Sequence, residues 1–101
     1  MIGIDITRIS RFEKMTGLAR FLDKFHVDGD TALEAAKTWA CLEAVYKAEA
    51  GGYTFTDIKI LFPKNQPPKI IELRPVLKYD YTLSLSHDHD LVVAVALARL
   101  R

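Results

Sequence analysis

The chain has 101 residues, of which half are apolar and 27% are charged, and 14 Lys and Arg against 13 Asp and Glu leave a net charge of +1. This is the balance of a globular protein, and so small a charge gives no reason to expect a nucleic-acid or membrane partner. The single cysteine, Cys41, excludes an internal disulfide and a zinc site built from cysteines alone. No apolar run approaches the roughly 20 residues that span a bilayer, and the first residues lack the basic-then-apolar order of a secretory signal. We therefore expect a single cytoplasmic domain over residues 1–101.

The first quarter of the chain predicts a strand followed by two short helices. Apolar residues alternate with others over residues 2–6, which predicts a buried strand with its three isoleucines on the core face and Asp5 on the other. Residues 8–25 have the apolar spacing of helices, and Gly17 divides them into two pieces.

The longest predicted element is a helix that begins after residue 30. Asp30 or Thr31 can cap its start, and Glu34 follows at the spacing of a capping box. The alanine-rich stretch that comes next favours helix as far as Gly51 and Gly52, which form a stop signal.

After Gly52 the apolar period changes from that of a helix to that of a strand. Four strands are predicted, at residues 56–62, 69–73, 81–86 and 91–97. The segment 86–90 is short enough to make the last two an antiparallel hairpin. The order of elements predicts an α+β fold, with a mainly antiparallel sheet of about five strands packed against helices that include one long central helix.

Two groups of charged residues in the first half of the chain are candidates for chemistry. Asp5 is unusual inside a strand; it either caps a following turn near Arg8 or supplies an oxygen ligand to a hard cation such as Mg²⁺. Glu43 and Lys47 stand four residues apart and share one face of the long helix. They form either a surface ion pair or a carboxylate ligand beside a lysine that neutralises phosphate.

The densest polar group is His87–Asp90, between the last two strands. It is either a solvent-exposed hairpin turn or part of a metal site, although no third soft ligand stands out. Because side chains alternate along a strand, His87 continues the face of Leu83 and Leu85, and we expect it to be held at the rim of the sheet. The chain has no GxGxxG, P-loop, GxSxG or HExxH motif, which disfavours dinucleotide binding, nucleotide hydrolysis and the common hydrolases.

Three segments together resemble one family: GIDITRISRF at 3–12, WACLEAVYKAEA at 39–50 and SLSHDHDLVVAVAL at 84–97. They are similar to the small phosphopantetheinyl transferases known as holo-acyl-carrier-protein synthases. That family has a Gly-x-Asp strand at its start, an aromatic-led helix with Lys-Glu-Ala-x-x-Lys-Ala, and a Ser-x-Ser-His strand near its end. Leu42 and Thr38 stand where the family has a lysine and an arginine of its coenzyme A surface, and the glycine-rich turn after the helix is shortened.

The resemblance implies transfer of the 4′-phosphopantetheine arm of coenzyme A to a serine of an apo acyl carrier protein, with Mg²⁺ and release of adenosine 3′,5′-bisphosphate. Asp5 and Glu43 would then hold Mg²⁺, and Lys47 would neutralise phosphate. The catalytic residues implied are Asp5, Glu43, Lys47 and His87. The coenzyme A-binding residues implied are Lys47, Gly51, Gly52, Ser86 and His87.

Carrier proteins of this family are acidic, and residues 8–24 are locally basic, with five basic residues against two acidic ones. The expected carrier contacts are Arg8, Arg11, Lys14 and Arg20. The resemblance further implies a homotrimer with the site between subunits, which suits a chain that buries only roughly 60–70% of its unfolded surface.

Three other interpretations of the sequence remain. The chain is alternatively a catalytically impaired homologue that serves as a carrier-protein-binding or scaffold subunit, as the changes at Thr38 and Leu42 suggest. It is alternatively an unrelated α+β interaction domain, or a metal-binding module built on the His87–Asp90 turn.

Overall fold

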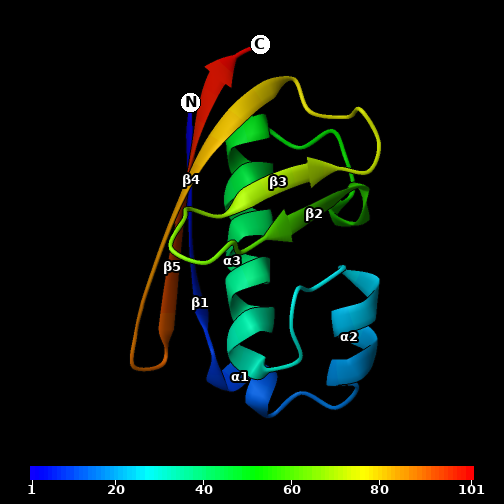
Figure 1. Ribbon diagram of the computed structural model, residues 1–101, viewed down its shortest axis with the longest axis vertical. Helices are drawn as coiled ribbons and strands as arrows, with labels where there is room; N and C mark the ends of the chain where they lie inside the picture. Colours follow the sequence, from blue (N-terminus) through cyan, green and yellow to red (C-terminus); the bar gives the residue numbers. More distant parts are fainter.

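The long helix α3 (Ala32–Glu49) is the centre of the fold in this computed structural model, which describes residues 1–101. Three strands stand along one side of α3 and the short helix α2 lies along another (Figure 1). The remaining elements, in chain order, are β1 (Ile2–Arg8), α1 (Ser10–Glu13), α2 (Leu18–Lys24), the 3-10 helix η1 (Phe55–Asp57), β2 (Ile58–Leu61), β3 (Lys69–Glu72), β4 (Tyr79–Asp88) and β5 (Leu91–Leu100). No helix is both long enough and apolar enough to cross a membrane.

The five strands form two antiparallel sheets, which confirms the expected α+β class. The larger sheet has the order β1-β5-β4, and the smaller one pairs β2 with β3. The predicted hairpin of the last two strands is confirmed: β4 and β5 pair from Tyr79 with Leu100 to Asp88 with Leu91. Each of these strands is longer than the alternation alone indicated, and only His89 and Asp90 are left in the turn.

The predicted limits of α3 are confirmed by its caps. The Thr31 hydroxyl accepts a hydrogen bond from the Glu34 backbone N–H at 3.3 Å, and Glu34 Oε1 accepts one from the Thr31 N–H at 3.0 Å. Hydrogen bonding from the Thr31 hydroxyl holds the pKa of Glu34 below its usual value. At the other end, Ala50 turns left-handed at φ 62°, followed by Gly51 at φ 78°, which ends the helix.

Of two further predicted boundaries, the start of β2 differs from the structure and the helical break at Gly17 agrees with it. The strand expected from residue 56 begins at Ile58, because Asp57 folds back on Thr54 and closes the 3-10 turn of η1. Asp57 Oδ2 accepts hydrogen bonds from both the backbone N–H and the hydroxyl of Thr54, each at 3.1 Å. The predicted helical break at Gly17 is confirmed, because this residue has φ 79° and separates α1 from α2.

The prediction that the isoleucines of β1 face the core is wrong. Ile2, Ile4 and Ile6 are 62%, 52% and 63% exposed, and it is the face of Gly3, Asp5 and Thr7 that packs on α3. A Cβ atom on Gly3 would lie 1.8 Å from the Ala44 carbonyl oxygen, so the strand and the helix touch through their backbones.

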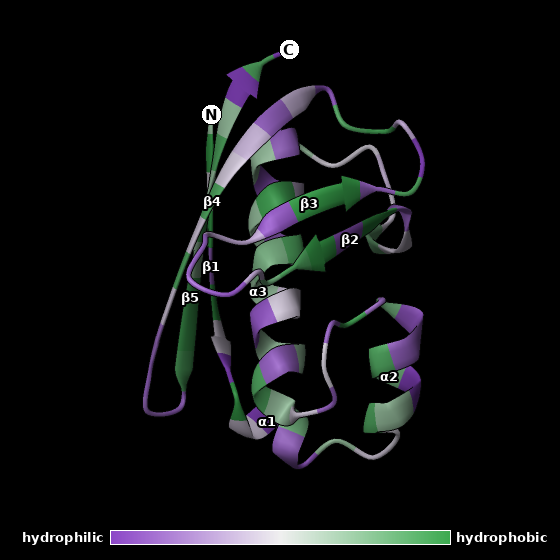
Figure 2. Cartoon of the chain, viewed as in Figure 1, coloured by the Kyte–Doolittle hydropathy of each residue, from purple (hydrophilic) through white to green (hydrophobic).

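Strand β5, at the centre of the large sheet, is arranged like β1. Val92, Ala94 and Ala96 are buried on the side of α3, whereas Val93, Val95 and Leu97 pair with the isoleucines of β1 and share their outward face. Figure 2 shows hydrophobic colour along most of β5. The outer face of the large sheet is therefore apolar along β1 and β5, whereas β4 contributes Thr82, Ser84 and Ser86 to it.

Candidate functional site

Asp5 and Lys47 meet where β1 packs on α3. Lys47 Nζ lies 3.3 Å from Asp5 Oδ1 and also donates a hydrogen bond to the Ile4 carbonyl at 3.0 Å. The Thr7 hydroxyl donates to the other oxygen, Asp5 Oδ2, at 2.6 Å. The side chain of Asp5 is only 13% exposed, whereas that of Lys47 is 51% exposed. Asp5 therefore faces the helix from within a strand, and it does not cap a turn near Arg8.

Glu43 lies one helical turn before Lys47, on the same face of α3. It is half-buried and next to Ala44, the residue against which Gly3 packs. Its carboxylate makes no hydrogen bond or ion pair with another residue. The ion pair with Lys47, one of the two alternatives for these residues, is therefore not formed, and Lys47 pairs with Asp5. The contact between β1 and α3 thus brings the Asp5 carboxylate to Lys47, on the helix that carries Glu43 one turn earlier.

The residues expected to bind coenzyme A do not gather at one place within a single chain. Ser86 and His87 are near the hairpin end of β4, whereas Gly51 and Gly52 follow the C-terminal end of α3, which lies far from the β4–β5 turn (Figure 1). His87 pairs with Val92 and so shares the face that was expected, but its side chain is exposed and is not held at the rim. A hollow of about 410 Å³ lies around it and is lined by Arg8, Ser86, His87, Asp88, His89, Asp90, Leu91 and Val93.

Asp90 fastens the β4–β5 turn to the start of α1. Its Oδ1 accepts a hydrogen bond from the Ser10 backbone N–H and its Oδ2 one from the Ser10 hydroxyl, both at 2.7 Å. These two bonds hold the pKa of the Asp90 carboxyl below its usual value, and Arg8 lies 3.7 Å away. Sequence reasoning missed this contact because its partners are far apart along the chain. No three His, Cys, Asp or Glu side chains gather in a group that could hold a metal, in this turn or elsewhere.

The two positions that depart from the family pattern are inside the protein. Thr38 and Leu42 are both fully buried, and Leu42 is among the largest completely buried side chains. In this chain they are part of the packing between α3 and the rest of the fold. Cys41, between them, is also buried, and burial raises the pKa of its thiol to about 12, which makes it a poor nucleophile.

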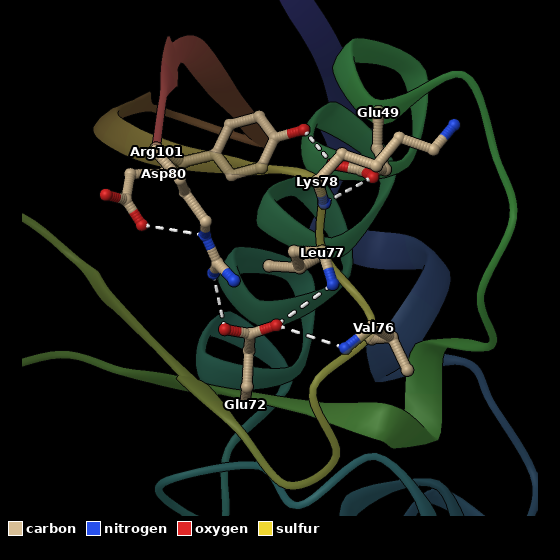
Figure 3. Close-up of polar contacts among 8 residues, drawn as sticks. Glu49, Glu72, Val76, Leu77, Lys78, Asp80 and Arg101 are labelled. Carbon is tan, nitrogen blue, oxygen red and sulfur yellow. Dashed lines mark hydrogen bonds and ion pairs between the residues drawn. The ribbon is translucent and has the colours of Figure 1, made fainter.

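A second polar cluster lies beside the C-terminal end of α3 and was not anticipated from the sequence (Figure 3). The carboxylate of Glu49, which is 1% exposed, accepts a hydrogen bond from the Tyr81 hydroxyl at 2.5 Å and one from the Lys78 N–H at 2.8 Å. Burial, reinforced by this bond to Glu49, raises the pKa of Tyr81. The cluster thereby ties α3 to β4 and to the connection that precedes it.

Glu72 holds the same connection from the side of β3. Its Oε1 accepts hydrogen bonds from the backbone N–H groups of Val76 at 3.2 Å and Leu77 at 2.9 Å, and its Oε2 pairs with Arg101 (Figure 3). Arg101 also bonds Asp80 at 3.0 Å. These contacts give the connection between β3 and β4 a structural role.

Comparison with known proteins supports the resemblance seen in the three sequence segments. The model of the 4′-phosphopantetheinyl transferase superfamily matches residues 1–96. The holo-acyl-carrier-protein synthase of Campylobacter curvus is 37% identical over 96% of this chain and 98% of its own length. That of Aquifex aeolicus is 35% identical over 95% of both chains.

The fold agrees with the same group of enzymes. The crystal structure of the Helicobacter pylori holo-acyl-carrier-protein synthase in complex with coenzyme A matches this chain with a TM-score of 0.82 and 30% sequence identity. The match covers 98% of this chain and 100% of that one. The chain therefore belongs to the holo-acyl-carrier-protein synthase family of the 4′-phosphopantetheinyl transferase superfamily.

Proposed function

We propose that this chain transfers the 4′-phosphopantetheine arm of coenzyme A to a serine hydroxyl of an apo acyl carrier protein. The observation that carries the proposal is the contact of Asp5 with Lys47 between β1 and α3, with Glu43 one turn away. The three residues match the family motifs, and the contact between β1 and α3 supports grouping them although they come from two separate elements. In the reaction, the serine oxygen forms a bond to the phosphorus next to the pantetheine arm, and the bond from that phosphorus to the bridging oxygen of the pyrophosphate breaks. Adenosine 3′,5′-bisphosphate leaves with the bridging oxygen, and the serine hydroxyl releases its proton.

The donor set of this site fits a divalent cation such as Mg²⁺. Asp5 and Glu43 supply carboxylate oxygens, the ligands that this hard ion prefers, and the Glu43 carboxylate has no partner within the chain. Two protein carboxylates leave coordination positions for phosphate oxygens and water. When bound, Mg²⁺ would neutralise charge on the pyrophosphate of coenzyme A and stabilise the leaving group.

Lys47 supplies a fixed positive charge beside this site. The Ile4 carbonyl accepts one of its hydrogen bonds, which holds the ammonium group at the junction of β1 and α3. Half of its side chain is exposed, so a phosphate oxygen can reach it from solvent. We propose that Lys47 neutralises phosphate charge during transfer, and that His87 and Ser86, with Gly51 and Gly52, contact coenzyme A.

We further propose that the protein works as a homo-oligomer, with the trimer favoured by the family resemblance. The outer face of the large sheet exposes an apolar surface whose members include Ile2, Ile4, Ile6, Leu91 and Leu97. A continuous apolar surface of this kind is typical of an interface. Because the proposed coenzyme A residues lie at opposite ends of one chain, we propose that a site between subunits unites them.

The basic side chains at the start of the chain support an acidic partner. Arg8, Arg11, Lys14 and Arg20 are all exposed, and they lie on or beside the first two helices. The Arg11 guanidinium stacks over the ring of Trp39 at 5.3 Å, which orients it on the surface of α3. We propose that these residues bind the acidic carrier protein.

The retained charged residues favour an active enzyme over an impaired scaffold. Thr38 and Leu42, which lack the charges that the family has at these positions, are packed in the core of this chain. The carboxylates and the lysine of the proposed site are all retained.

The proposal is tested by incubating the protein with coenzyme A, Mg²⁺ and an apo acyl carrier protein, and measuring the intact mass of the carrier. We expect the carrier to gain the mass of the arm, and Asp5→Asn or Glu43→Gln to abolish the gain. Asp28→Asn, which changes an exposed loop carboxylate, is the matched control and should transfer normally. Carrier binding without any mass gain, across several carriers, would instead establish the scaffold function.

A further inference from the structure

Thr7 is the buried neighbour of Asp5 on the helix-facing side of β1. It is 5% exposed, and its hydroxyl makes a single hydrogen bond, to Asp5 Oδ2 at 2.6 Å. The residues opposite this pair on β5 are Val92 and Ala94, both fully buried and without polar side-chain atoms. Asp5 is therefore the only side chain that satisfies the Thr7 hydroxyl.

The two oxygens of the Asp5 carboxylate have different partners from different elements. Thr7 on β1 holds Oδ2, and Lys47 on α3 lies against Oδ1. The helix that carries Lys47 also carries Glu43 one turn away. The hydrogen bond from Thr7 thus sets which oxygen of Asp5 is directed toward the α3 side of the site.

We propose that Thr7 is a positioning residue for the divalent cation, an inference that rests on the function proposed above. It fixes the rotation of the Asp5 carboxylate so that Oδ1 is presented to the ion on the side of Glu43. A carboxylate that ligates a metal is ordinarily held by such a hydrogen bond, and loss of the partner typically weakens metal affinity about 10- to 100-fold. Thr7 does not touch the ion or the substrate and acts only through Asp5.

The test measures binding of Mn²⁺, without coenzyme A, to the full-length protein by the loss of the free-ion electron paramagnetic resonance signal. Thr7→Val retains the shape of the side chain and removes the hydroxyl, and we expect it to raise the Mn²⁺ dissociation constant about 10- to 100-fold. Thr7→Ser restores the hydroxyl and should restore binding. Thr16→Val, at an exposed position, is the matched control and should bind as the wild type does.

A transfer assay provides the second measurement. If Thr7 positions the ligand, Thr7→Val raises the Mg²⁺ concentration needed for half-maximal rate and leaves the rate at saturating Mg²⁺ nearly unchanged. A fall in the saturating rate alone, without a change in Mg²⁺ dependence, overturns the inference. Thr7→Ala is measured in the same way should Thr7→Val fail to fold.

The outcomes separate this inference from the proposed function. Binding of Mn²⁺ that depends on Asp5 but is equal in the wild type and in Thr7→Val overturns the role of Thr7 alone. Binding to the wild type that is no tighter than to Asp5→Asn overturns the metal site itself, and the role of Thr7 with it.

Discussion

Replacing Gly3 by alanine tests the contact on which the proposed site depends. The new Cβ would lie 1.8 Å from the Ala44 carbonyl oxygen and 2.8 Å from the Ala48 backbone nitrogen. All of these atoms belong to the backbone or are fixed to it, so no change of rotamer relieves the overlap. The strand has to withdraw from α3 by about 1.2 Å to reach the 3.0 Å below which real Cβ contacts essentially do not occur.

This displacement determines how much unfolding free energy the substitution is expected to cost. Inserting a methyl group into a packed interior costs about 1 to 3 kcal/mol, and a gap of even 0.5 to 1 Å forfeits roughly a quarter to a half of the dispersion energy of the atoms beside it. Because the clash is between backbones, we expect Gly3→Ala to lower the free energy of unfolding by about 3 kcal/mol. With a urea dependence of about 1.5 kcal/mol/M, the unfolding midpoint falls by about 2 M.

The assay is urea unfolding at a fixed protein concentration, since self-association makes stability concentration-dependent. Gly17→Ala is the control: it has open space around the added methyl but a φ of 79°, so it carries only the left-handed penalty of about 1 to 2 kcal/mol. A loss below 1 kcal/mol for Gly3→Ala would refute the backbone contact between β1 and α3. We also expect lower transfer activity, because the 3.3 Å contact of Asp5 with Lys47 spans the same junction.

Three further predictions concern the packing and the surface of the fold. Tyr81→Phe leaves the buried Glu49 carboxylate without one of its two donors and should lower the free energy of unfolding by about 1.5 to 3 kcal/mol. Tyr79→Phe removes a hydroxyl that has no partner and should lower it little. Equal losses for the two variants would contradict a stabilising role of the Tyr81–Glu49 hydrogen bond. Because the folded-state pKa of Asp90 is depressed, its stabilisation is present above the usual pKa of about 4 and is lost as the pH falls through the lower folded value. Asp90→Asn should therefore be less stable than the wild type at pH 7, and the difference between their urea midpoints should narrow below about pH 4. A difference that does not change with pH would exclude stabilisation by the ionised Asp90 carboxylate. Ile4→Asp should dissociate the oligomer, which light scattering would detect as a lower mass, whereas Ile71→Asp, at a similarly exposed position on β3, should not. An unchanged mass for Ile4→Asp would show that the outer face of the large sheet is not the interface.

Local features of the fold could be predicted from the sequence because their signals are local. The capping box of Thr31 and Glu34 and the glycines after α3 are separated by a few residues from the helix they bound. The β4–β5 hairpin is similar, since a short polar segment between two apolar strands leaves only one connection. In each case, neighbouring residues determine the conformation.

The face of β1 that packs in the core could not be predicted in this way. Alternation separates the isoleucines from Gly3 and Asp5, but it does not say which set meets the helix. The close approach of α3 decides the matter, since only a residue without a side chain fits against Ala44. The isoleucines are then left for the outer face, where a second copy of the chain is expected.

The candidate site was anticipated only in part, because its contacts are between residues distant in sequence. The family resemblance brought Asp5, Glu43 and Lys47 together, and the contact between β1 and α3 supports that grouping. The Ser10–Asp90 contact was not identified, because its partners are 80 residues apart. Thr7 is only two residues from Asp5, and strand alternation places both on one face, but alternation does not say that this face meets α3. The burial of Thr38 likewise depends on which face of α3 is covered.

The most direct test of the proposed site is a crystal structure of the protein with coenzyme A and Mn²⁺, with the ion located by its anomalous scattering. The account predicts one Mn²⁺ ion bound to a carboxylate oxygen of Asp5 and one of Glu43, with phosphate oxygens of coenzyme A completing its coordination. An ion bound elsewhere, or bound to the phosphates without either carboxylate, would contradict it.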